Sequence, residues 1–120
     1  MTSIDPLRPT RRQVAYIAGP ITANAAGDTA GFVETGRRVA EEMRKRGWSC
    51  ILPHMNSFAI DGWKLDDYLA EDFELLQRCD FVVLLPHWRL SEGTKREVEF
   101  ASERGIPVFD FRTMLPDYRA

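Results

Sequence analysis

Four short apolar runs alternate with three segments of helical spacing, and this alternation constrains the fold more than any other feature of the sequence. The runs occupy residues 14–18, 48–53, 80–86 and 106–111. The segments between them place apolar side chains at the intervals of amphipathic helices, over residues 32–47, 64–79 and 91–105. Strands that alternate with helices in this way are joined by right-handed crossovers and form a parallel sheet.

The pattern predicts a small doubly wound α/β domain of the flavodoxin-like type. The runs are apolar at most positions, so helices should cover both faces of the sheet. The expected strand order is 2-1-3-4, and the tail after residue 111 leaves room for a further short element such as a fifth strand. Residues 1–13 are polar and contain two prolines, which indicates a flexible arm before a single domain at 14–120.

Charge, hydropathy and cysteine content exclude several classes of function. The chain of 120 residues has a net charge of −2 and no basic stripe, so polymeric nucleic acid is not an expected partner. No apolar run reaches membrane-spanning length and no signal peptide is visible, so we expect a cytoplasmic protein without a membrane partner. Cys50 and Cys79 lie in apolar surroundings without metal-ligand spacing, which favours two buried thiols over a disulfide or a zinc site.

In sheets of this type, ligands bind at the carboxyl ends of the strands, near the point where the strand order switches. The segments that should meet there are Gly19–Gly31, His54–Trp63 and His87–Thr94. Neither a GxGxxG fingerprint nor a Walker sequence occurs, so the dinucleotide-binding and ATP-binding classes lack support.

Four residues in these segments are candidates for the wall of a site. His54 and His87 have no second ligand at a useful spacing, so each is expected at a site wall or on the surface rather than on a metal. Trp63 could stack on a base or pack in the core. Gly93 would let backbone approach a ligand, although a glycine at a strand-to-helix turn is a weak signal. We include His54, Trp63 and Gly93 among the predicted substrate-binding residues.

Asp72 interrupts an apolar stripe in the segment 64–79. The stripe comprises Leu65, Leu69, Leu76 and Cys79, and Asp72 stands between Leu69 and Leu76. Burial of a carboxylate is costly unless the group is paired, hydrogen-bonded or facing a cavity. Asp72 is therefore either a stripe-edge residue with a local partner or, as we favour, a carboxylate that faces a polar pocket.

Glu97 stands apart from the other acids of the segment 91–105 by its helical phase. The inner face is marked by Thr94, Val98 and Ala101, and Glu97 lies about 60° from the centre of that face. Glu99 lies on the far side and is expected to be an ordinary surface charge. Because Glu97 is near the start of the helix, the positive end of the helix dipole should keep it ionised, as a nucleophile or an electrostatic stabiliser requires.

Three segments, YIAGPI at 16–21, DFELLQRCDFVVLLP at 72–86 and SEGTKRE at 91–97, carry a resemblance to a known family. Their order, with GIPV at 105–108, resembles that of nucleoside 2-deoxyribosyltransferases and the related nucleoside 5′-monophosphate N-glycosidases. The resemblance extends from about residue 14 to residue 108. It is strongest to a small, poorly characterised branch found in phage and bacterial genomes.

The resemblance implies roles for individual residues. Glu97 matches the catalytic glutamate, Tyr16 matches a tyrosine near the sugar and the nucleophile, and Asp72 matches the carboxylate that contacts a sugar hydroxyl or assists the departing base. Ser91 matches a position six residues before the nucleophile, which is usually Asp in the transferases and Ser in the monophosphate hydrolases. The residues that match the turn bordering the sugar are Gly19, Pro20 and Ile21.

The implied reaction is attack of Glu97 on the anomeric carbon of a (deoxy)nucleoside or nucleotide, followed by transfer of the sugar to a second base or to water. No metal or organic cofactor is implied. The hydrolases often carry Ser and Arg where Pro20 and Thr22 stand here, which argues against a bound phosphate, whereas Ser91 argues for one. Family members are homodimers or larger, and Met114 and Tyr118 are candidates for reaching into a neighbouring site.

Two other functions are weighed against this enzyme. The first is a module on the same fold that binds a nucleotide or nucleoside derivative without turning it over. The second is a receiver-like or interaction domain, which normally places a phosphorylatable Asp after the third strand. The third apolar run ends in Pro86 and His87 instead, which disfavours that function.

Overall fold

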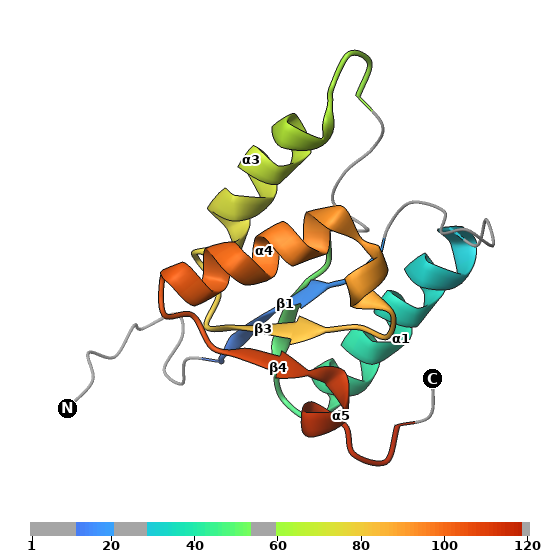
Figure 1. Ribbon diagram of the computed structural model, residues 1–120. Helices are drawn as coiled ribbons and strands as arrows, with labels where there is room; N and C mark the ends of the chain where they lie inside the picture. Colours follow the sequence, from blue (N-terminus) through green and yellow to red (C-terminus); the bar gives the residue numbers. More distant parts are fainter. Residues whose placement is uncertain (1–11, 21–28, 54–59, 119–120) are drawn as a thin grey trace.

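A four-stranded parallel sheet of order β2-β1-β3-β4 forms the centre of the computed structural model, which describes residues 12–20, 29–53 and 60–118 (Figure 1). The elements in chain order are β1 (Val14–Ala18), α1 (Thr29–Lys45), β2 (Ser49–Ile51), α3 (Leu65–Leu76), β3 (Phe81–Leu84), the 3-10 helix η1 (Trp88–Leu90), α4 (Glu92–Glu103), β4 (Val108–Asp110) and α5 (Phe111–Met114). The class, the strand direction and the strand order confirm the predicted doubly wound fold.

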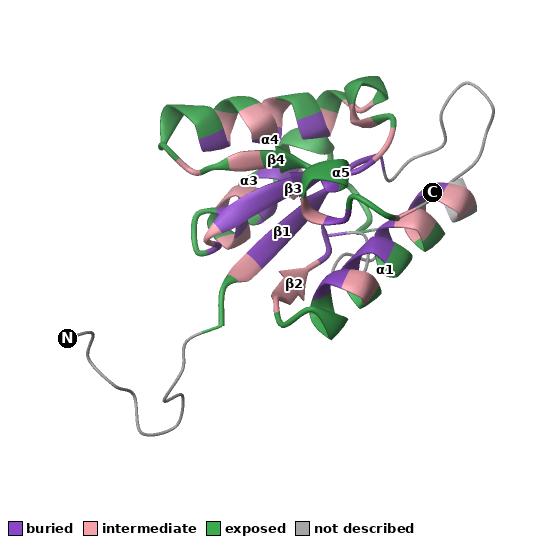
Figure 2. Ribbon diagram, turned by 90° about the horizontal axis from the view of Figure 1, so that it is seen from below, coloured by how far each residue is buried: buried purple, intermediate pink, exposed green. Residues whose placement is uncertain are grey.

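Helices cover both faces of the sheet, as Figures 1 and 2 show. Helices α1 and α5 pack on one face, where Ala15 and Ile17 of β1 belong to a buried apolar cluster with residues of both helices. Helices α3 and α4 pack on the other face, where Tyr16 and Ala18 join a second cluster. Successive side chains of a strand point to opposite faces, so the five residues of β1 contribute alternately to two separate cores.

Several elements are shorter than their sequence patterns predict. Helix α3 ends at Leu76. Helix α4 begins at Glu92, because the side chain of Ser91 caps it. Strand β3 begins at Phe81. The preceding residue, Asp80, accepts a hydrogen bond from the backbone N–H of Val14 at 2.7 Å. No helix within the described ranges is long and apolar enough to span a membrane.

The first and the last described segments of the chain contact the rest of the domain. Arg12 falls within the predicted arm, yet its guanidinium donates to Ser49 Oγ at 3.1 Å and to the carbonyl of Trp48 at 2.8 Å. After β4 the described part of the tail forms helix α5 rather than a fifth strand. Met114 and Tyr118 pack against the core on the α1 face of their own chain, on the opposite side of the sheet from Tyr16.

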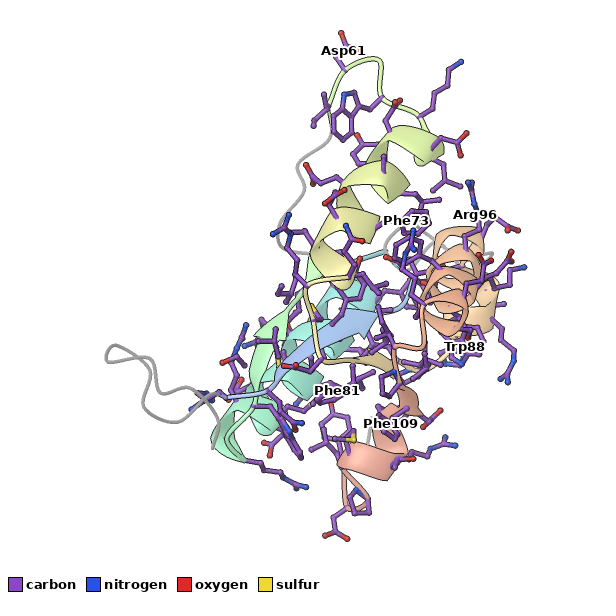
Figure 3. The ribbon with its side chains drawn as sticks, turned by 90° about the vertical axis from the view of Figure 1, so that its left-hand side faces the viewer. Asp61, Phe73, Phe81, Trp88, Arg96 and Phe109 are labelled. Carbon is purple, nitrogen blue, oxygen red and sulfur yellow. The ribbon has the colours of Figure 1, made fainter. Side chains whose placement is uncertain are left out.

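Helix α3 extends beyond the strands, and its first half packs against α4 (Figures 1 and 3). Leu65 was expected on the buried stripe but is 45% exposed, because the sheet does not reach that far. Two contacts cross the seam between the helices. The Arg96 guanidinium meets Asp66 Oδ1 at 2.7 Å, and the rings of Phe73 and Phe100 stack with centroids 4.3 Å apart.

Candidate functional site

Three ionisable side chains meet beneath the seam between α3 and α4, the region in which Figure 3 labels Phe73 and Arg96. Tyr16 comes from the middle of β1, Asp72 from α3 and Glu97 from α4, and their exposed fractions are 0%, 7% and 5%. The Tyr16 hydroxyl donates a hydrogen bond to Glu97 Oε2. Asp72 is close enough to act electrostatically on both groups. Residues that span 81 positions of the sequence, from Tyr16 to Glu97, thus form one buried acidic cluster.

The secondary-structure periods explain why these three residues converge. Strand alternation turns Tyr16 toward α3 and α4 while Ile17 faces α1. On α3, Asp72 is buried between Leu69 and Leu76, as helical spacing predicts. On α4, the buried polar residues are Thr94 and Glu97, whereas Glu92, Glu99 and Glu103 are exposed. The helical phase of the sequence therefore separated the inward carboxylates from the surface ones correctly.

The protonation state of Glu97 differs from the one that the sequence predicted. Burial raises the pKa of Glu97 to about 8, and the nearby Asp72 adds to the rise, while the hydrogen bond from Tyr16 opposes it. The expectation that the helix dipole keeps Glu97 ionised is wrong, since Glu97 is the sixth residue of α4 and the dipole acts mainly within the first turn. Desolvation at this position outweighs it.

The other acids of the cluster are shifted in the same direction. Burial, with a smaller contribution from Glu71, raises the pKa of Asp72 to about 6. Burial and the two carboxylates also raise the pKa of Tyr16 far above its ordinary value, so Tyr16 remains a hydrogen-bond donor at every physiological pH. Near neutral pH the cluster can therefore hold a proton that is available for transfer.

The two cysteines supply no reactive thiolate to the site. Both are free, Cys79 is buried and Cys50 is partly buried, in agreement with the predicted thiols. Burial, followed by the charge of Asp80, raises the pKa of Cys79 to about 11, so the thiol stays protonated. Within the described ranges no three metal-ligating side chains gather at a possible metal site.

Ser91 is the N-cap residue of α4, directly before the first helical residue, Glu92. Its Oγ accepts hydrogen bonds from the backbone N–H of Thr94 at 3.1 Å and from the Thr94 hydroxyl at 3.0 Å. These bonds satisfy a donor that the first turn of a helix would otherwise leave unpaired. Gly93 lies in the same turn, and a Cβ added there would lie 3.5 Å from Leu65 Cδ1, an ordinary contact.

Gly19 and Pro20 are buried directly after β1. A Cβ added at Gly19 would lie 2.7 Å from the Cβ of Leu85, which is closer than real side chains approach each other. The residue that the resemblance assigned to a sugar-bordering turn is therefore required for packing of the chain after β1 against the chain after β3.

Of the remaining predicted site residues, two are exposed and two lie outside the described residues. Trp63 is 37% exposed and packs edge-on against Tyr68 of α3, with ring centroids 5.0 Å apart. It is thus a surface residue and not part of the core. His87 is exposed and has a left-handed backbone with φ of 63°. Ile21 and His54 lie outside the described residues.

Sequence reasoning missed the Phe73–Phe100 stack and the Asp66–Arg96 ion pair. Phe73 directly follows Asp72, so the stack fixes α3 against α4 beside the acidic cluster. Arg96 bridges the two helices on their exposed outer side. Both pairs join residues at least 27 positions apart, and neither leaves a signal in the periodicity of a single helix.

We expect replacement of Glu97 by glutamine to flatten the pH dependence of stability. A carboxyl whose pKa rises on folding holds more protons in the folded state, so the free energy of unfolding falls as pH rises from about 4.5 to about 8. Glutamine does not titrate, and its amide oxygen can still accept from Tyr16. Denaturant unfolding at about pH 5 and about pH 8 measures the difference, with Glu99→Gln as control. Equal slopes in wild type and Glu97→Gln would contradict the raised pKa.

Comparison with family models shows the family of the chain. A family model described as Domain of unknown function (DUF4406) matches residues 13–110. That range includes all four strands and the three residues of the acidic cluster. No match to a curated protein was found.

Proposed function

Because the chain belongs to the family described as domain of unknown function DUF4406, whose description assigns no activity, we propose a function from the chemistry of its site. The proposed activity is cleavage of the N-glycosidic bond of a (deoxy)nucleoside or nucleotide, with transfer of the sugar to another base or to water. The observation that carries the proposal is the buried cluster in which Tyr16 donates to Glu97 beside Asp72.

In the first step, an ionised Glu97 carboxylate attacks the anomeric carbon of the sugar. The C–N bond to the base breaks, and its electron pair leaves with the base, which takes up a proton. The pKa of Asp72 is raised to about 6 by burial, which suits that carboxyl to supply this proton near neutral pH. The products of the step are a free base and a glycosyl ester on Glu97.

In the second step, water or a second base attacks the anomeric carbon of the ester. The C–O bond to Glu97 breaks, the carboxylate is regenerated, and the attacking group loses a proton to the cluster. Tyr16 donates to Glu97 Oε2 in the resting protein. The phenol thus favours the ionised form that the first step requires, against the desolvation that opposes it. The chemistry requires neither a metal ion nor an organic cofactor.

The order of the sequence segments supports the same residues independently. The resemblance to nucleoside 2-deoxyribosyltransferases and nucleoside 5′-monophosphate N-glycosidases assigns catalytic roles to Tyr16, Asp72 and Glu97. Helical phase selected both carboxylates without reference to any family. The buried arrangement of the three residues agrees with those assignments, since a water-poor site strengthens electrostatic effects on a developing oxocarbenium charge.

Further parts of the proposal concern the setting of the enzyme. We propose that it acts on small molecules in the cytoplasm, because two unbonded cysteines are typical of a reducing compartment. A homodimer or larger assembly is expected from the resemblance. The described part of the tail packs on the α1 face, so a residue from a neighbouring chain would have to come from another segment or from a rearranged tail.

The proposal is tested by incubating the protein with a panel of deoxynucleosides, ribonucleosides and their 5′-monophosphates, with and without a second free base. Chromatography should show release of the base, or exchange for the added base. A folded sample that acts on none of these compounds would overturn the enzymatic function. Because a carboxyl with a pKa of about 8 is mostly protonated at neutral pH, a binding module is the second candidate, and it predicts a rise in Tm with ligand but no turnover.

A further inference from the structure

The separation of Asp72 and Glu97 depends on how two helices are held together. Asp72 lies on α3 and Glu97 lies on α4. Helix α3 extends beyond the strands, and among the described elements α4 is the one that α3 contacts most (Figure 1). Contacts across the seam between α3 and α4 therefore set the distance between the two carboxyl groups, whereas the sheet sets the position of Tyr16.

One contact across the seam involves residues next to both carboxyl groups. The rings of Phe73 and Phe100 stack with their planes 4° apart and their centroids 4.3 Å apart. Phe73 directly follows Asp72 in α3. Phe100 follows Glu97 by three residues in α4, and residues at this spacing are neighbours on a helix surface. A displacement of either ring would thus move backbone that carries a carboxyl group of the acidic cluster.

The Phe100 ring has a second partner. The guanidinium carbon of Arg104, the C-cap residue of α4, lies 4.2 Å from the centroid of this ring. A cation over the face of an aromatic ring is attracted by the electrons of the ring. This attraction and the parallel stacking both restrict rotation of the Phe100 side chain. Two aliphatic side chains in the same place would fix the geometry of the seam less closely.

The ion pair that also crosses the seam is weaker. Asp66 and Arg96 meet at 2.7 Å, but their side chains are 80% and 42% exposed. Exposed ion pairs contribute little to stability, because water screens the charges. Asp66 also lies six residues before Asp72, which is more than one helical turn away. Of these two contacts, the stack is therefore the one that can fix the carboxyl groups.

We propose that Phe73 and Phe100 are positioning residues whose stack fixes the separation of the two carboxyl groups in the acidic cluster. Neither ring takes part in making or breaking a bond, and each acts through the carboxyl residue beside it. The consequence for catalysis rests on the proposed N-glycosidic activity, in which one carboxyl group attacks and the other supplies a proton. The positioning itself is measurable without any substrate.

The titration of Glu97 reports on this positioning. The groups that act on its carboxyl are Tyr16 from β1 and Asp72 from α3. Burial and the charge of Asp72 raise the pKa of Glu97 to about 8, and the hydrogen bond from Tyr16 opposes the rise. A looser seam admits water and weakens the first two effects, while Tyr16 stays fixed by the sheet. Loss of the stack should therefore lower the pKa of Glu97.

The positioning is tested by replacing each ring separately, with Phe73→Leu and Phe100→Leu, in protein labelled with ¹³C at the glutamate carboxyl. NMR then follows Glu97, whose signal is the one that Glu97→Gln removes. We expect each leucine variant to lower the titration midpoint by at least about one pH unit, a tenfold change in the ionisation constant. The double variant should lower it no further, since both changes remove the same contact. Both rings are partly buried, so the fold should persist.

Two further variants separate positioning from the loss of any aromatic ring. Phe100→Tyr keeps a ring that can stack, and its midpoint should equal that of the wild type. Phe109→Leu makes the leucine change at an exposed ring that packs edge-on against Phe81 of the core on the α1 face (Figure 3), and it should leave the midpoint unchanged. Wild-type midpoints in both Phe73→Leu and Phe100→Leu would overturn the proposal.

The kinetics of base release give a second readout. The pH profile of kcat/KM reports the ionisation of the free enzyme, so its basic limb should move to lower pH in both leucine variants, in step with the NMR midpoint, and return in Phe100→Tyr. The height of the profile is less diagnostic, because misplacement of Glu97 lowers the rate while its easier ionisation raises it. A shifted midpoint with an unshifted limb would overturn the catalytic consequence. Absence of turnover by the wild type would overturn the proposed activity alone, since the titration decides the positioning.

Discussion

Replacement of Glu97 by glutamine is expected to lower the rate of base release by at least about a thousandfold, because loss of a covalent nucleophile leaves only binding and electrostatic contributions. Glutamine has nearly the shape of glutamate, and its amide oxygen can accept the hydrogen bond from Tyr16. The fold should therefore persist while the reaction is lost. Chromatographic measurement of base release under single-turnover conditions separates this loss from a change in substrate binding.

Glu99→Gln is the matched control for this result. Glu99 lies two residues further along the same helix and is exposed, so its replacement changes the same charge without touching the acidic cluster. We expect Glu99→Gln to retain wild-type turnover. Intact-protein mass spectrometry should show a sugar adduct on the wild-type protein and none on Glu97→Gln. Substantial turnover by Glu97→Gln would rule out the ester mechanism, even if base release by the wild type is confirmed.

Replacement of Tyr16 by phenylalanine is expected to lower kcat/KM at neutral pH by about ten- to a hundredfold, the value of a hydrogen bond to a charged group. The phenol hydroxyl donates to Glu97 and holds the pKa of that carboxyl down against burial. Without it, the pKa of Glu97 rises beyond about 8, and less of the carboxylate is ionised. The active form has Glu97 ionised and Asp72 protonated, so the pKa that rises is the higher one of the pair. The basic limb of the pH–rate profile should therefore move to higher pH.

The pH profile distinguishes this electrostatic role from simple damage to the fold. If Tyr16 acts through the protonation of Glu97, activity of Tyr16→Phe should recover toward the wild-type value as pH rises. A loss that is equal at every pH would mean that the hydroxyl supports packing or substrate contact instead. The limbs belong to the coupled pair of Glu97 and Asp72 rather than to one residue, so both variants should be compared over the whole range.

Periodicity in single segments was sufficient to predict the fold and the inward carboxylates. The apolar runs predicted the parallel order 2-1-3-4, which the sheet confirms. Helical spacing placed Asp72 and Glu97 on buried faces, and both are buried. The burial of the two carboxylates depends on residues three or four positions apart, which is the range over which a sequence pattern reports directly on structure. The strand order follows instead from the topology rules for strands that alternate with helices.

Properties that depend on distant residues were not predictable in the same way. The protonation of Glu97 follows from how deeply α3 and α4 together bury it, and no pattern within α4 states that depth. Leu65 fits the apolar stripe of α3 but lies past the strands, where the sheet offers no cover. The stack of Phe73 on Phe100 depends on the register of two helices, which sequence spacing leaves undetermined.

The alternation of β1 between the two cores has a consequence for how such a chain can change during evolution. Tyr16 and Ile17 are neighbours, yet one serves the acidic cluster and the other packs beneath α1. An inserted or deleted residue within β1 would exchange the faces of every side chain beyond it, and would remove the tyrosine from Glu97 while placing a phenol in an apolar core. Length variation among relatives should therefore accumulate in the connecting segments, while β1 keeps its frame.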